Sequence, residues 1–483
     1  MYLLKDLEPK EVFRFFESIC DLPHGSKNTK LLSDFCAVFA RMRGLWCQQD
    51  KAGNIIIRKE ASKGYEDHPT VILQGHLDMV CEKLPEVKID FQKDGLTLKL
   101  DGDRLHADGT TLGGDDGIAV AMALAVLDDK NLVHPPLEVL FTGDEEIGML
   151  GATALDGKAL KGRTLINIDS EDEGILTAGC AGGVRSTLTL PVRRESARGI
   201  PCTLSLDGLI GGHSGTEIHK GRANAIARLG RWLTLLTENG VDYTVLALSG
   251  GAKENVIPKE SSVTLVLPTG ITEGVRAAAA QFAAQMKAEY GTADPEICLQ
   301  LTEQGCGGYQ ALDGASAQRL RKALLLMPWG VQAMSMDVPG LVETSLNLGV
   351  AELDDSEAIL RFSLRSSVPS AKELLSCKLQ TLTELLGGTV RFHGDYPAWT
   401  YARESALRDR CVAVYEAQYG AKPQIVALHA GLECGILSGK IDGLDCISFG
   451  PNLLHVHTPN ERADIASVAR VWEYLKAILA YKA

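Results

Sequence analysis

Hydrophobic residues recur at helical spacing near the start of the chain and then give way to short β-branched runs. Residues 8–20 and 27–42 place apolar side chains three and four positions apart, which predicts two amphipathic helices. The runs at 54–58 and 70–74 are rich in isoleucine and valine, which favours strands. Strand and helix patterns then alternate to about residue 180, an order typical of α/β architecture.

The pattern changes after Gly183 and again near residue 390. The stretch between these points holds new strands, a glycine-rich turn and long helices. The last part of the chain predicts a helix at 404–419 and a buried strand at 444–449. A terminal amphipathic helix is expected from about Asp464, which is a favourable N-cap residue.

Composition and charge narrow the class of protein. A hydrophobic content of 45% and a charged content of 23% are ordinary for a soluble globular protein, and 483 residues predict at least two domains. The net charge of -13 argues against a nucleic-acid partner. No apolar run approaches the ~18 residues of a membrane-spanning helix, and the N-terminus lacks the pattern of a secretory signal. Because the cysteines form no C-x-x-C pair, we expect reduced thiols in a cytoplasmic protein.

Short segments that carry acidic residues or histidine stand where predicted strands run out. Ligands of open α/β sheets bind outside the carboxyl ends of the strands, so these segments lie where a site is expected. Together they offer two histidines and at least three carboxylates, a ligand set suited to a pair of zinc-like ions. We therefore interpret the chain as a metallohydrolase. The segments are 71–78, 113–117, 137–146, 165–169 and 457–461.

The first two segments each admit a plain and a functional interpretation. His76 and Asp78 alternate along a strand, so Asp78 could orient the imidazole, although a single H-x-D is usually part of a surface loop. Asp115 precedes a predicted helix and could simply cap it. The glycines around Asp115 and Asp116 allow close backbone approach, however, and a carboxylate can bridge two cations ~3.5–4 Å apart.

The other segments supply the remaining candidates. Adjacent glutamates such as Glu145 and Glu146 are common on surface turns. If Glu146 binds a metal ion, Glu145 stands beside the bound water as a free carboxylate, which is what a general base requires. Asp169 ends an apolar strand, where an acid needs compensation. His457 lies in a short proline-containing loop, and His455 is the second choice there.

A metal site that includes both Asp169 and His457 requires two distant parts of the chain to meet. The economical solution is an α/β fold in which a catalytic domain is interrupted by an inserted domain of normal size. We expect the catalytic α/β domain, with a central and mostly parallel sheet, to comprise residues 1–183 and 393–483. Residues 184–392 are expected to form an inserted α+β lid domain.

Motifs of a known family occur in order along the chain. They are H-L-D-M-V, G-G-D-D-G, G-D-E-E-I-G, N-I-D-S-E-D and H-T-P-N-E. In this order they resemble the di-zinc peptidase family that includes aminoacylases and carboxypeptidase-type enzymes. Further segments are most similar to its aminoacyl-histidine dipeptidase branch, which cleaves carnosine: G-H-S-G, E-N-V-I-P, R-S-S and H-A-G-L-E-C-G. The resemblance covers nearly the whole chain.

The resemblance implies an activity and a metal site. The activity is hydrolysis of Xaa-His dipeptides such as β-alanyl-histidine, through a metal-bridging water that a glutamate general base activates. Two divalent metal ions are implied, most suitably Zn²⁺, with Co²⁺ or Mn²⁺ as alternatives. Asp115 would bridge the ions, His76 and Asp169 would bind one of them, and Glu146 and His457 would bind the other.

The resemblance also implies which residues act on the substrate. Glu145 would be the general base, and Asp78 would orient a metal-binding imidazole. In the lid, His213 would polarise the scissile carbonyl or hold the oxyanion. Asn255 and Arg365 would grip the dipeptide, since arginine suits a carboxylate.

The resemblance further implies a homodimer formed through the lid, and it gives no role to His429 or Glu433. Two other functions remain compatible with the sequence. The first is a related di-metal amidohydrolase, either an aminoacylase or a dipeptidase of other specificity. The second is a catalytically silent peptide-binding protein on the same scaffold. An intact Glu145 speaks against the second, because binding alone needs no base.

Overall fold

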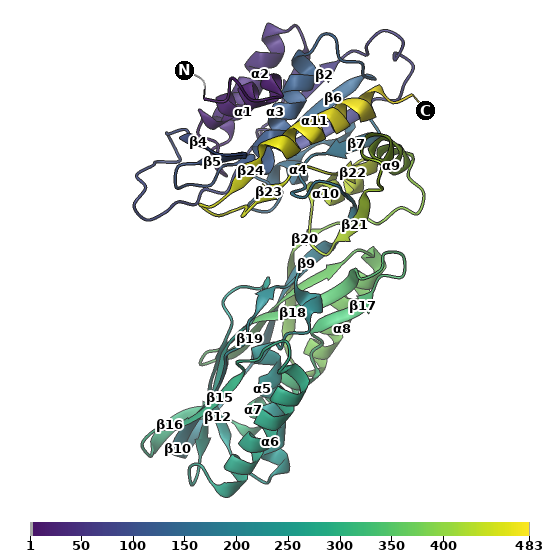
Figure 1. Ribbon diagram of the computed structural model, residues 1–483. Coiled ribbons are helices and arrows are strands. Elements are labelled where there is room, and N and C mark those ends of the chain that lie inside the picture. Colours follow the sequence, from purple (N-terminus) through teal and green to yellow (C-terminus); the bar gives the residue numbers. More distant parts are fainter. Residues whose placement is uncertain (1–2, 483) are drawn as a thin grey trace. The chain divides into compact units, whose positions relative to one another are not determined.

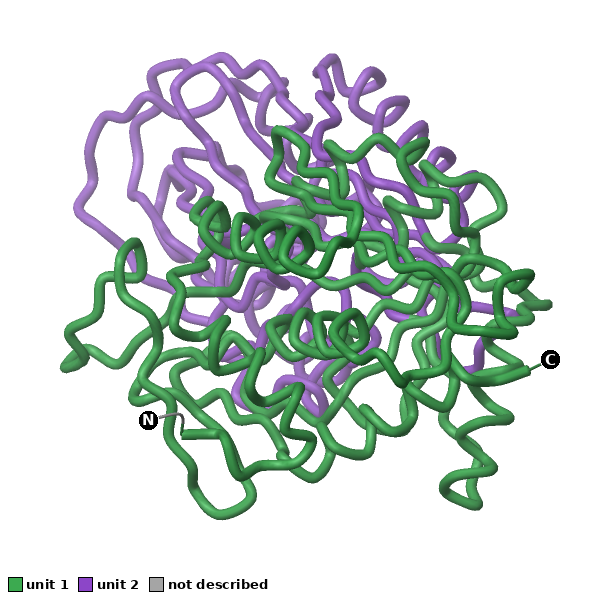
Figure 2. Tube along the Cα trace, turned by 90° about the horizontal axis from the view of Figure 1, so that it is seen from above, with its two compact units in different colours: residues 1–180, 399–427, 432–483 green, residues 181–398, 428–431 purple. Residues whose placement is uncertain are grey.

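The chain folds into two compact units, which Figure 2 shows in different colours. The computed structural model describes residues 3–482. The sequence pattern places the borders of the inserted part at 184 and 392, and it does not associate residues 428–431 with that part. Unit 1 comprises residues 1–180, 399–427 and 432–483, and unit 2 comprises residues 181–398 and 428–431.

Unit 1 is built around an 8-stranded sheet. In sheet order its strands are β1 (Trp46–Gln49), β2 (Ile55–Lys59), β6 (Leu137–Thr142), β3 (Val71–His76), β7 (Thr164–Asn167), β22 (Asp445–Ser448), β8 (Ile175–Cys180) and β21 (Gln424–Leu428). The pairs β6–β3, β3–β7 and β7–β22 are parallel, whereas the pairs β1–β2, β2–β6 and β22–β8 are antiparallel, so the sheet is mixed. β3 and β6 are buried along their whole length, which explains why most of their residues are apolar, although β3 also buries Gln74 and His76 and β6 buries Glu138. The α/β class expected from the sequence is confirmed.

Helices complete the core of unit 1 (Figure 1). They are α1 (Lys10–Cys20), α2 (Lys30–Met42), α3 (Gly114–Asp128), α4 (Leu150–Ala154), the 3₁₀ turn η1 (Gly157–Ala159), α9 (Ala406–Tyr419), α10 (Glu433–Lys440) and α11 (Ile465–Ala480). From residue 117 to residue 127, α3 consists of small and apolar residues, so this part can be buried on nearly all sides between α1 and β3. α11 begins as predicted, because the Asp464 side chain accepts a hydrogen bond from the Ser467 N–H.

A smaller sheet in unit 1 joins an early hairpin to the end of the chain. Its strands, in order, are β23 (Leu453–Leu454), β24 (Arg462–Asp464), β5 (Arg104–Ala107) and β4 (Leu98–Asp101). β23 pairs with β24 in antiparallel register. The loop between these two strands carries His457, so the small sheet fixes both stems of that loop.

Unit 2 has an antiparallel 10-stranded sheet and long helices, in agreement with the expected α+β character. The main path of the sheet is β15 (Cys298–Glu303), β10 (Arg194–Asp207), β14 (Ser261–Leu267), β12 (Thr244–Gly250), β18 (Val342–Leu353), β19 (Glu357–Ser366), β9 (Gly182–Pro191) and β20 (Thr389–Tyr396). β16 (Gly307–Leu312) joins β10, and β17 (Gly330–Met334) joins β18. The remaining elements are α5 (Ala225–Glu238), α6 (Glu273–Tyr290), α7 (Gly314–Leu326), α8 (Pro369–Leu385), η2 (Ile218–Lys220) and the pair β11 (Gly212–His213) and β13 (Val256–Ile257). Among residues 3–482, no helix is both long and apolar enough to span a bilayer.

Candidate metal centre

The candidate centre lies in unit 1, at the edge where the parallel strands β3, β6 and β7 end. Parallel strands present their carboxyl ends at the same edge, so the residues that follow them converge. His76 is the last residue of β3, Glu145 and Glu146 follow β6, and Asp169 follows β7. The topology therefore gathers residues that are far apart in the sequence.

Asp115 occupies the middle of the centre. Its Oδ1 lies 3.0 Å from His76 Nε2, and its Oδ2 lies 3.2 Å from His457 Nε2. His457 Nε2 also lies 2.9 Å from Glu146 Oε1, and His76 Nε2 lies 3.8 Å from Asp169 Oδ1. The structure thus brings together all five residues that the sequence suggested as ligands, with one carboxylate between the two imidazoles.

The segment before α3 holds Asp115 in this position. Gly113 has a φ of 65°, a backbone conformation that favours glycine. The backbone N–H groups of Leu112, Gly113 and Gly114 donate to the buried Glu461 carboxylate over 2.8, 3.2 and 2.8 Å. The N-cap of α3 is Gly113, and the Asp115 side chain faces the histidines, so helix capping does not explain this aspartate. Glu461 is a functional candidate that sequence reasoning missed, although it closes the H-T-P-N-E motif.

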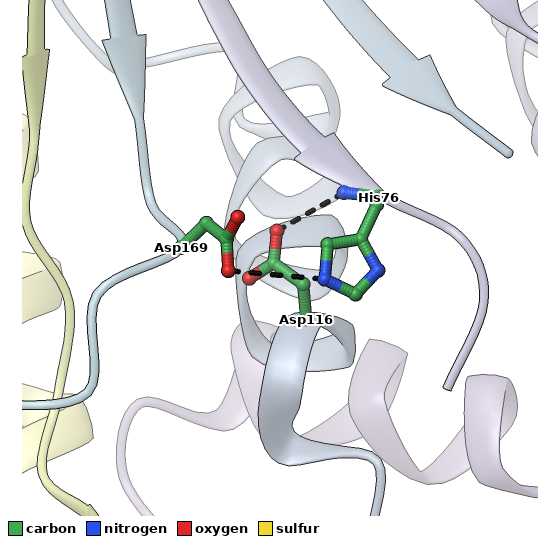
Figure 3. A group of neighbouring side chains, drawn as sticks. All are labelled: His76, Asp116 and Asp169. Carbon is green, nitrogen blue, oxygen red and sulfur yellow. Dashed lines mark hydrogen bonds and ion pairs between the residues drawn. The ribbon is translucent and has the colours of Figure 1, made fainter. Parts of the chain in front are cut away.

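Asp116 is a second residue that sequence reasoning left without a role. Its Oδ2 accepts a hydrogen bond of 3.0 Å from the backbone N–H of His76, as Figure 3 shows. A Cβ at Gly75 would lie 2.6 Å from Asp116 Oδ2, so the glycine allows this carboxylate to approach β3. The doubled aspartate was the available signal. Within residues 3–482, three groups have ligand atoms within 4.8 Å of one another: His76, Asp116 and Asp169; His76, Glu145 and Glu146; and Asp115, Glu146 and His457.

Asp78 contacts His76 and the turn that follows β6. Its carboxylate lies 3.6 Å from His76 Nδ1, but the backbone oxygen of Asp78 is closer to that nitrogen, at 2.9 Å. The carboxylate accepts hydrogen bonds from the backbone N–H groups of Glu145 and Glu146, over 2.8 and 3.2 Å, and from Ser26 Oγ. Asp78 therefore fixes the turn that carries both glutamates as well as the imidazole.

The electrostatics of the centre reflect its excess of carboxylates. Burial and nearby carboxylates, among them Glu433, raise the pKa of Glu145 to about 8. Burial together with Asp116 raises the pKa of Asp169 well above its usual range. Hydrogen bonds to two carboxylates raise the pKa of His457 to about 10. Each of these three pKa shifts favours the protonated form of its group. This is expected where carboxylates lie close together, because a bound proton reduces their mutual repulsion.

The donor set fits divalent cations. The backbone oxygen of Asp78 can only accept, so His76 Nδ1 carries the proton of that contact. In the neutral imidazole, Nε2 then directs a lone pair at Asp115 Oδ1, which is unfavourable unless a proton or a cation lies between them. His457 Nε2 faces two carboxylate oxygens but can carry only one proton. Imidazole nitrogen and carboxylate oxygen are common zinc ligands.

His213 belongs to unit 2, where a tight turn fixes its imidazole. Its backbone N–H donates to Glu217 Oε2 over 2.9 Å, and its Nδ1 accepts a hydrogen bond of 3.2 Å from the Thr216 N–H. Burial and the nearby Arg365 guanidinium lower the pKa of His213. The imidazole is therefore neutral at pH 7, and its proton resides on Nε2.

Arg365 and Asn255, the other two candidates for substrate binding, also belong to unit 2. Arg365 lies in β19 and donates from Nη1 to the Tyr396 hydroxyl over 3.0 Å. Its Nε is buried and finds no hydrogen-bond partner in the described chain. The backbone oxygen of Asn255 accepts a hydrogen bond of 2.9 Å from the Ser214 N–H, which ties its segment to the histidine turn.

Three residues without a sequence-derived role differ in environment. His429 is buried, and its Nε2 lies 2.7 Å from Ser345 Oγ. Glu433 is fully buried in unit 1. His455 is exposed and joins none of the three ligand groups found among residues 3–482. The loop therefore contributes His457 to the centre rather than His455.

The chain is similar to known proteins along almost its whole length. A family model described as Peptidase family M20/M25/M40 matches residues 72–481. Over 481 residues, the chain is 36% identical to the cytosol non-specific dipeptidase of Escherichia coli (strain K12), which covers 99% of this chain and 98% of that protein. The structure of aminoacylhistidine dipeptidase from Vibrio alginolyticus matches with a TM-score of 0.93 and 37% identity, covering 99% and 97% of the two chains. A tripeptidase from Staphylococcus aureus, at 15% identity and a TM-score of 0.55, shares the fold over 98% of each chain.

We expect the metal-free protein to lose thermal stability as the pH rises. The pKa of Glu145 is raised from 4.5 to about 8 by folding, and that of His457 from 6.5 to about 10. For each group, at pH values between its pKa in the unfolded chain and its higher pKa in the folded chain, the folded chain holds a proton that the unfolded chain releases. The free energy of unfolding therefore falls with increasing pH over this range. Calorimetry with a chelator should show this fall, and added zinc should raise the melting temperature most at alkaline pH. A zinc-induced gain that stayed constant between about pH 5 and pH 9 would contradict the expectation.

Proposed function

This chain belongs to the peptidase family M20/M25/M40, and on that basis we propose that it is a metal-dependent dipeptidase that cleaves Xaa-His dipeptides such as β-alanyl-histidine. Membership makes it a peptide hydrolase and confirms the family resemblance of its motifs. The main support for metal-dependent hydrolysis is the Asp115 carboxylate between two imidazoles, with Glu145 beside them. The similarity to the Vibrio protein named aminoacylhistidine dipeptidase supports the histidine preference.

The centre would hold two divalent ions, most suitably Zn²⁺, with Co²⁺ or Mn²⁺ as alternatives. His76 and Asp169 would hold one ion, Glu146 and His457 the other, and Asp115 both, which agrees with the distances between their atoms. Bound ions supply Lewis acidity, which polarises a peptide carbonyl and lowers the pKa of water.

Glu145 is the general base of the proposed reaction. Its backbone N–H is held by Asp78, so its side chain projects from a fixed turn. Burial and neighbouring carboxylates raise its pKa, which favours the uptake of a proton from the attacking water. The same carboxyl can then deliver that proton to the leaving amine.

His213 donates a hydrogen bond to the carbonyl oxygen as negative charge develops there. The Thr216 N–H occupies its Nδ1, so the Nε2–H remains as the donor. A neutral imidazole suits this role because its proton is held firmly and no charge has to be desolvated.

Arg365 receives the terminal carboxylate of the dipeptide. A buried guanidinium nitrogen without a partner is costly, and a carboxylate matches its planar geometry. Asn255 contacts the peptide from the segment that is tied to the His213 turn.

Unit 2 is the lid in this proposal, and it carries the interface of a homodimer. β17 lies at the margin of the sheet beside β18, and margins of sheets with exposed apolar side chains mark association surfaces. A cytoplasmic location is also proposed, in line with the name of the Escherichia coli relative. The exposed apolar residues near β17 are Leu325, Leu326, Val331, Met334 and Met336.

A dipeptidase of broader specificity is the second candidate. The Escherichia coli relative, at 36% identity, is named non-specific, whereas the Vibrio relative is named for aminoacylhistidine. Both candidates use the same metal centre and base, so side chains that contact the substrate must separate them.

A substrate panel on metal-loaded protein tests the function. The protein should bind about two ions per chain, as expected of a two-metal site, and cleave β-alanyl-histidine. The ratio kcat/KM is compared for dipeptides that end in histidine, dipeptides that end in other residues, and N-acetyl amino acids. A preference for histidine of ~10-fold or more supports the first candidate, and equal values support the second. Turnover of N-acetyl amino acids alone would indicate an aminoacylase, and no turnover at all would indicate a binding protein.

The base is tested by Glu145→Gln, which keeps the shape and removes proton acceptance. We expect kcat to fall by ~10²–10⁴ while the metal content, measured by atomic emission, stays unchanged. Glu146→Gln is the matched control and should lose metal. If Glu145→Gln lost the metal instead, the roles of the two glutamates would be reversed.

The lid residues are tested by His213→Ala and Arg365→Ala. Loss of an oxyanion donor should lower kcat by ~10²–10³ at unchanged metal content. Arg365→Ala should raise KM instead, because a carboxylate contact is present in the bound substrate as well as in the transition state. Near-wild-type kcat of His213→Ala at saturating dipeptide would reduce His213 to a structural turn residue.

A further inference from the structure

A layer of buried polar side chains lies behind the ligands, on the three central strands of unit 1. Gln74 belongs to β3, Thr142 to β6 and Asn167 to β7, and Glu433 reaches them from the first turn of α10. Their exposed fractions are 2%, 0%, 1% and 0%. Buried polar side chains at this depth require hydrogen-bond partners or a functional reason.

The hydrogen bonds of this layer converge on one atom. Glu433 Oε2 accepts from Gln74 Nε2 and from Thr142 Oγ1, each over 2.6 Å. Gln74 in turn accepts from Asn167 Nδ2 over 2.6 Å through its Oε1. Without Glu433, Gln74 Nε2 would keep only its longer bond of 3.2 Å to Thr142 Oγ1, and Thr142 Oγ1 only its bond of 3.4 Å to the Gly75 carbonyl. The short bonds that fix the Gln74 amide would be lost.

The strand residues of this polar layer lie close to the candidate ligands, on the strands that lead to them. Gln74 is two residues before His76 on β3, so both side chains point to the same side of the sheet. Thr142 is the direct partner of His76 in the parallel pairing of β3 with β6, and it precedes the turn of Glu145. Asn167 pairs with Gln74 and is two residues before Asp169. Glu433 thus touches the strand ends from which the ligands project, without being a ligand itself.

Glu433 is an unfavourable residue to bury if its role is only structural. Its Oε1 finds no hydrogen-bond partner in the described part of the chain. A carboxylate buried with one oxygen unpaired is unfavourable, and such exceptions to packing rules cluster at functional sites.

We propose that Glu433 is a positioning residue for the metal centre, which holds the ends of β3 and β6 through Gln74 and Thr142. It thereby sets the distance between the His76 imidazole and the turn of Glu145 and Glu146. This inference rests on the metal centre of the proposed function, but it does not depend on the identity of the substrate.

The test compares Glu433→Ala with Glu433→Gln. Removal of the carboxyl should weaken the binding of Zn²⁺ by ~10–100-fold, as is typical for residues that orient ligands, and lower kcat with little change in KM. The glutamine amide oxygen can accept the same two hydrogen bonds, so Glu433→Gln should recover most of the zinc affinity. Competition with a chromogenic chelator gives the affinity without any substrate.

Two further variants make the test selective. Glu138→Gln alters a buried glutamate at the opposite end of β6, which accepts from Arg58 and from the Lys161 and Gly162 N–H groups, so it should lower stability and leave zinc affinity unchanged. Thr142→Val removes one donor to Glu433 at constant shape and should weaken zinc binding even if Glu433→Ala does not fold.

Several results would overturn the role of Glu433. They are wild-type zinc affinity in Glu433→Ala or in Thr142→Val, and equal losses in Glu433→Ala and Glu433→Gln. Wild-type protein that binds zinc but cleaves no dipeptide would refute the proposed function alone, and the zinc measurements on the variants would still decide the role of Glu433.

Discussion

Unit 1 must hold several carboxylates together at one edge of its sheet against their mutual repulsion. Asp115 is central to this arrangement, because its two oxygens lie 3.0 and 3.2 Å from the imidazoles of His76 and His457. In the metal-free chain, bound protons supply the missing positive charge, as the raised pKa values of Glu145 and His457 indicate. Divalent cations can supply it instead, so stability, metal binding and proton transfer depend on the same charge balance.

Three further buried acids accept hydrogen bonds from the segments that carry the candidate ligands. Glu461 accepts three backbone N–H groups ahead of Asp115, and Asp78 accepts those of Glu145 and Glu146. Glu433 does the same for the side chains of the polar layer. These carboxylates accept hydrogen bonds from the protein, which fixes loops that would otherwise be adaptable. In metalloproteins, hydrogen bonds of this kind orient the side chains that bind the metal.

The fold alone does not select the substrate. A tripeptidase shares the fold at 15% identity, while the relatives named as dipeptidases are 36% and 37% identical. Function belongs to particular side chains grafted on such a scaffold. In unit 2, the turn of His213 is fixed by Glu217 and Thr216, so a single imidazole nitrogen is presented as a donor.

The sequence by itself determined the local elements and the kinds of ligand. The apolar spacing of α1, the cap at Asp464 and the apolar runs of β3 and β6 arise between residues close in sequence, so they are visible in the chain. The rule that ligands follow parallel strands applies to His76, Glu146 and Asp169. Asp115 and His457 instead follow strands of the small antiparallel sheet, so the rule alone does not bring them to the centre. Only the tertiary structure decided which oxygen faces which imidazole, and that Asp116 accepts the His76 N–H. The bond between Gln74 and Glu433 joins residues 359 positions apart. Contacts over such separations depend on how whole elements pack, and no local pattern records that packing.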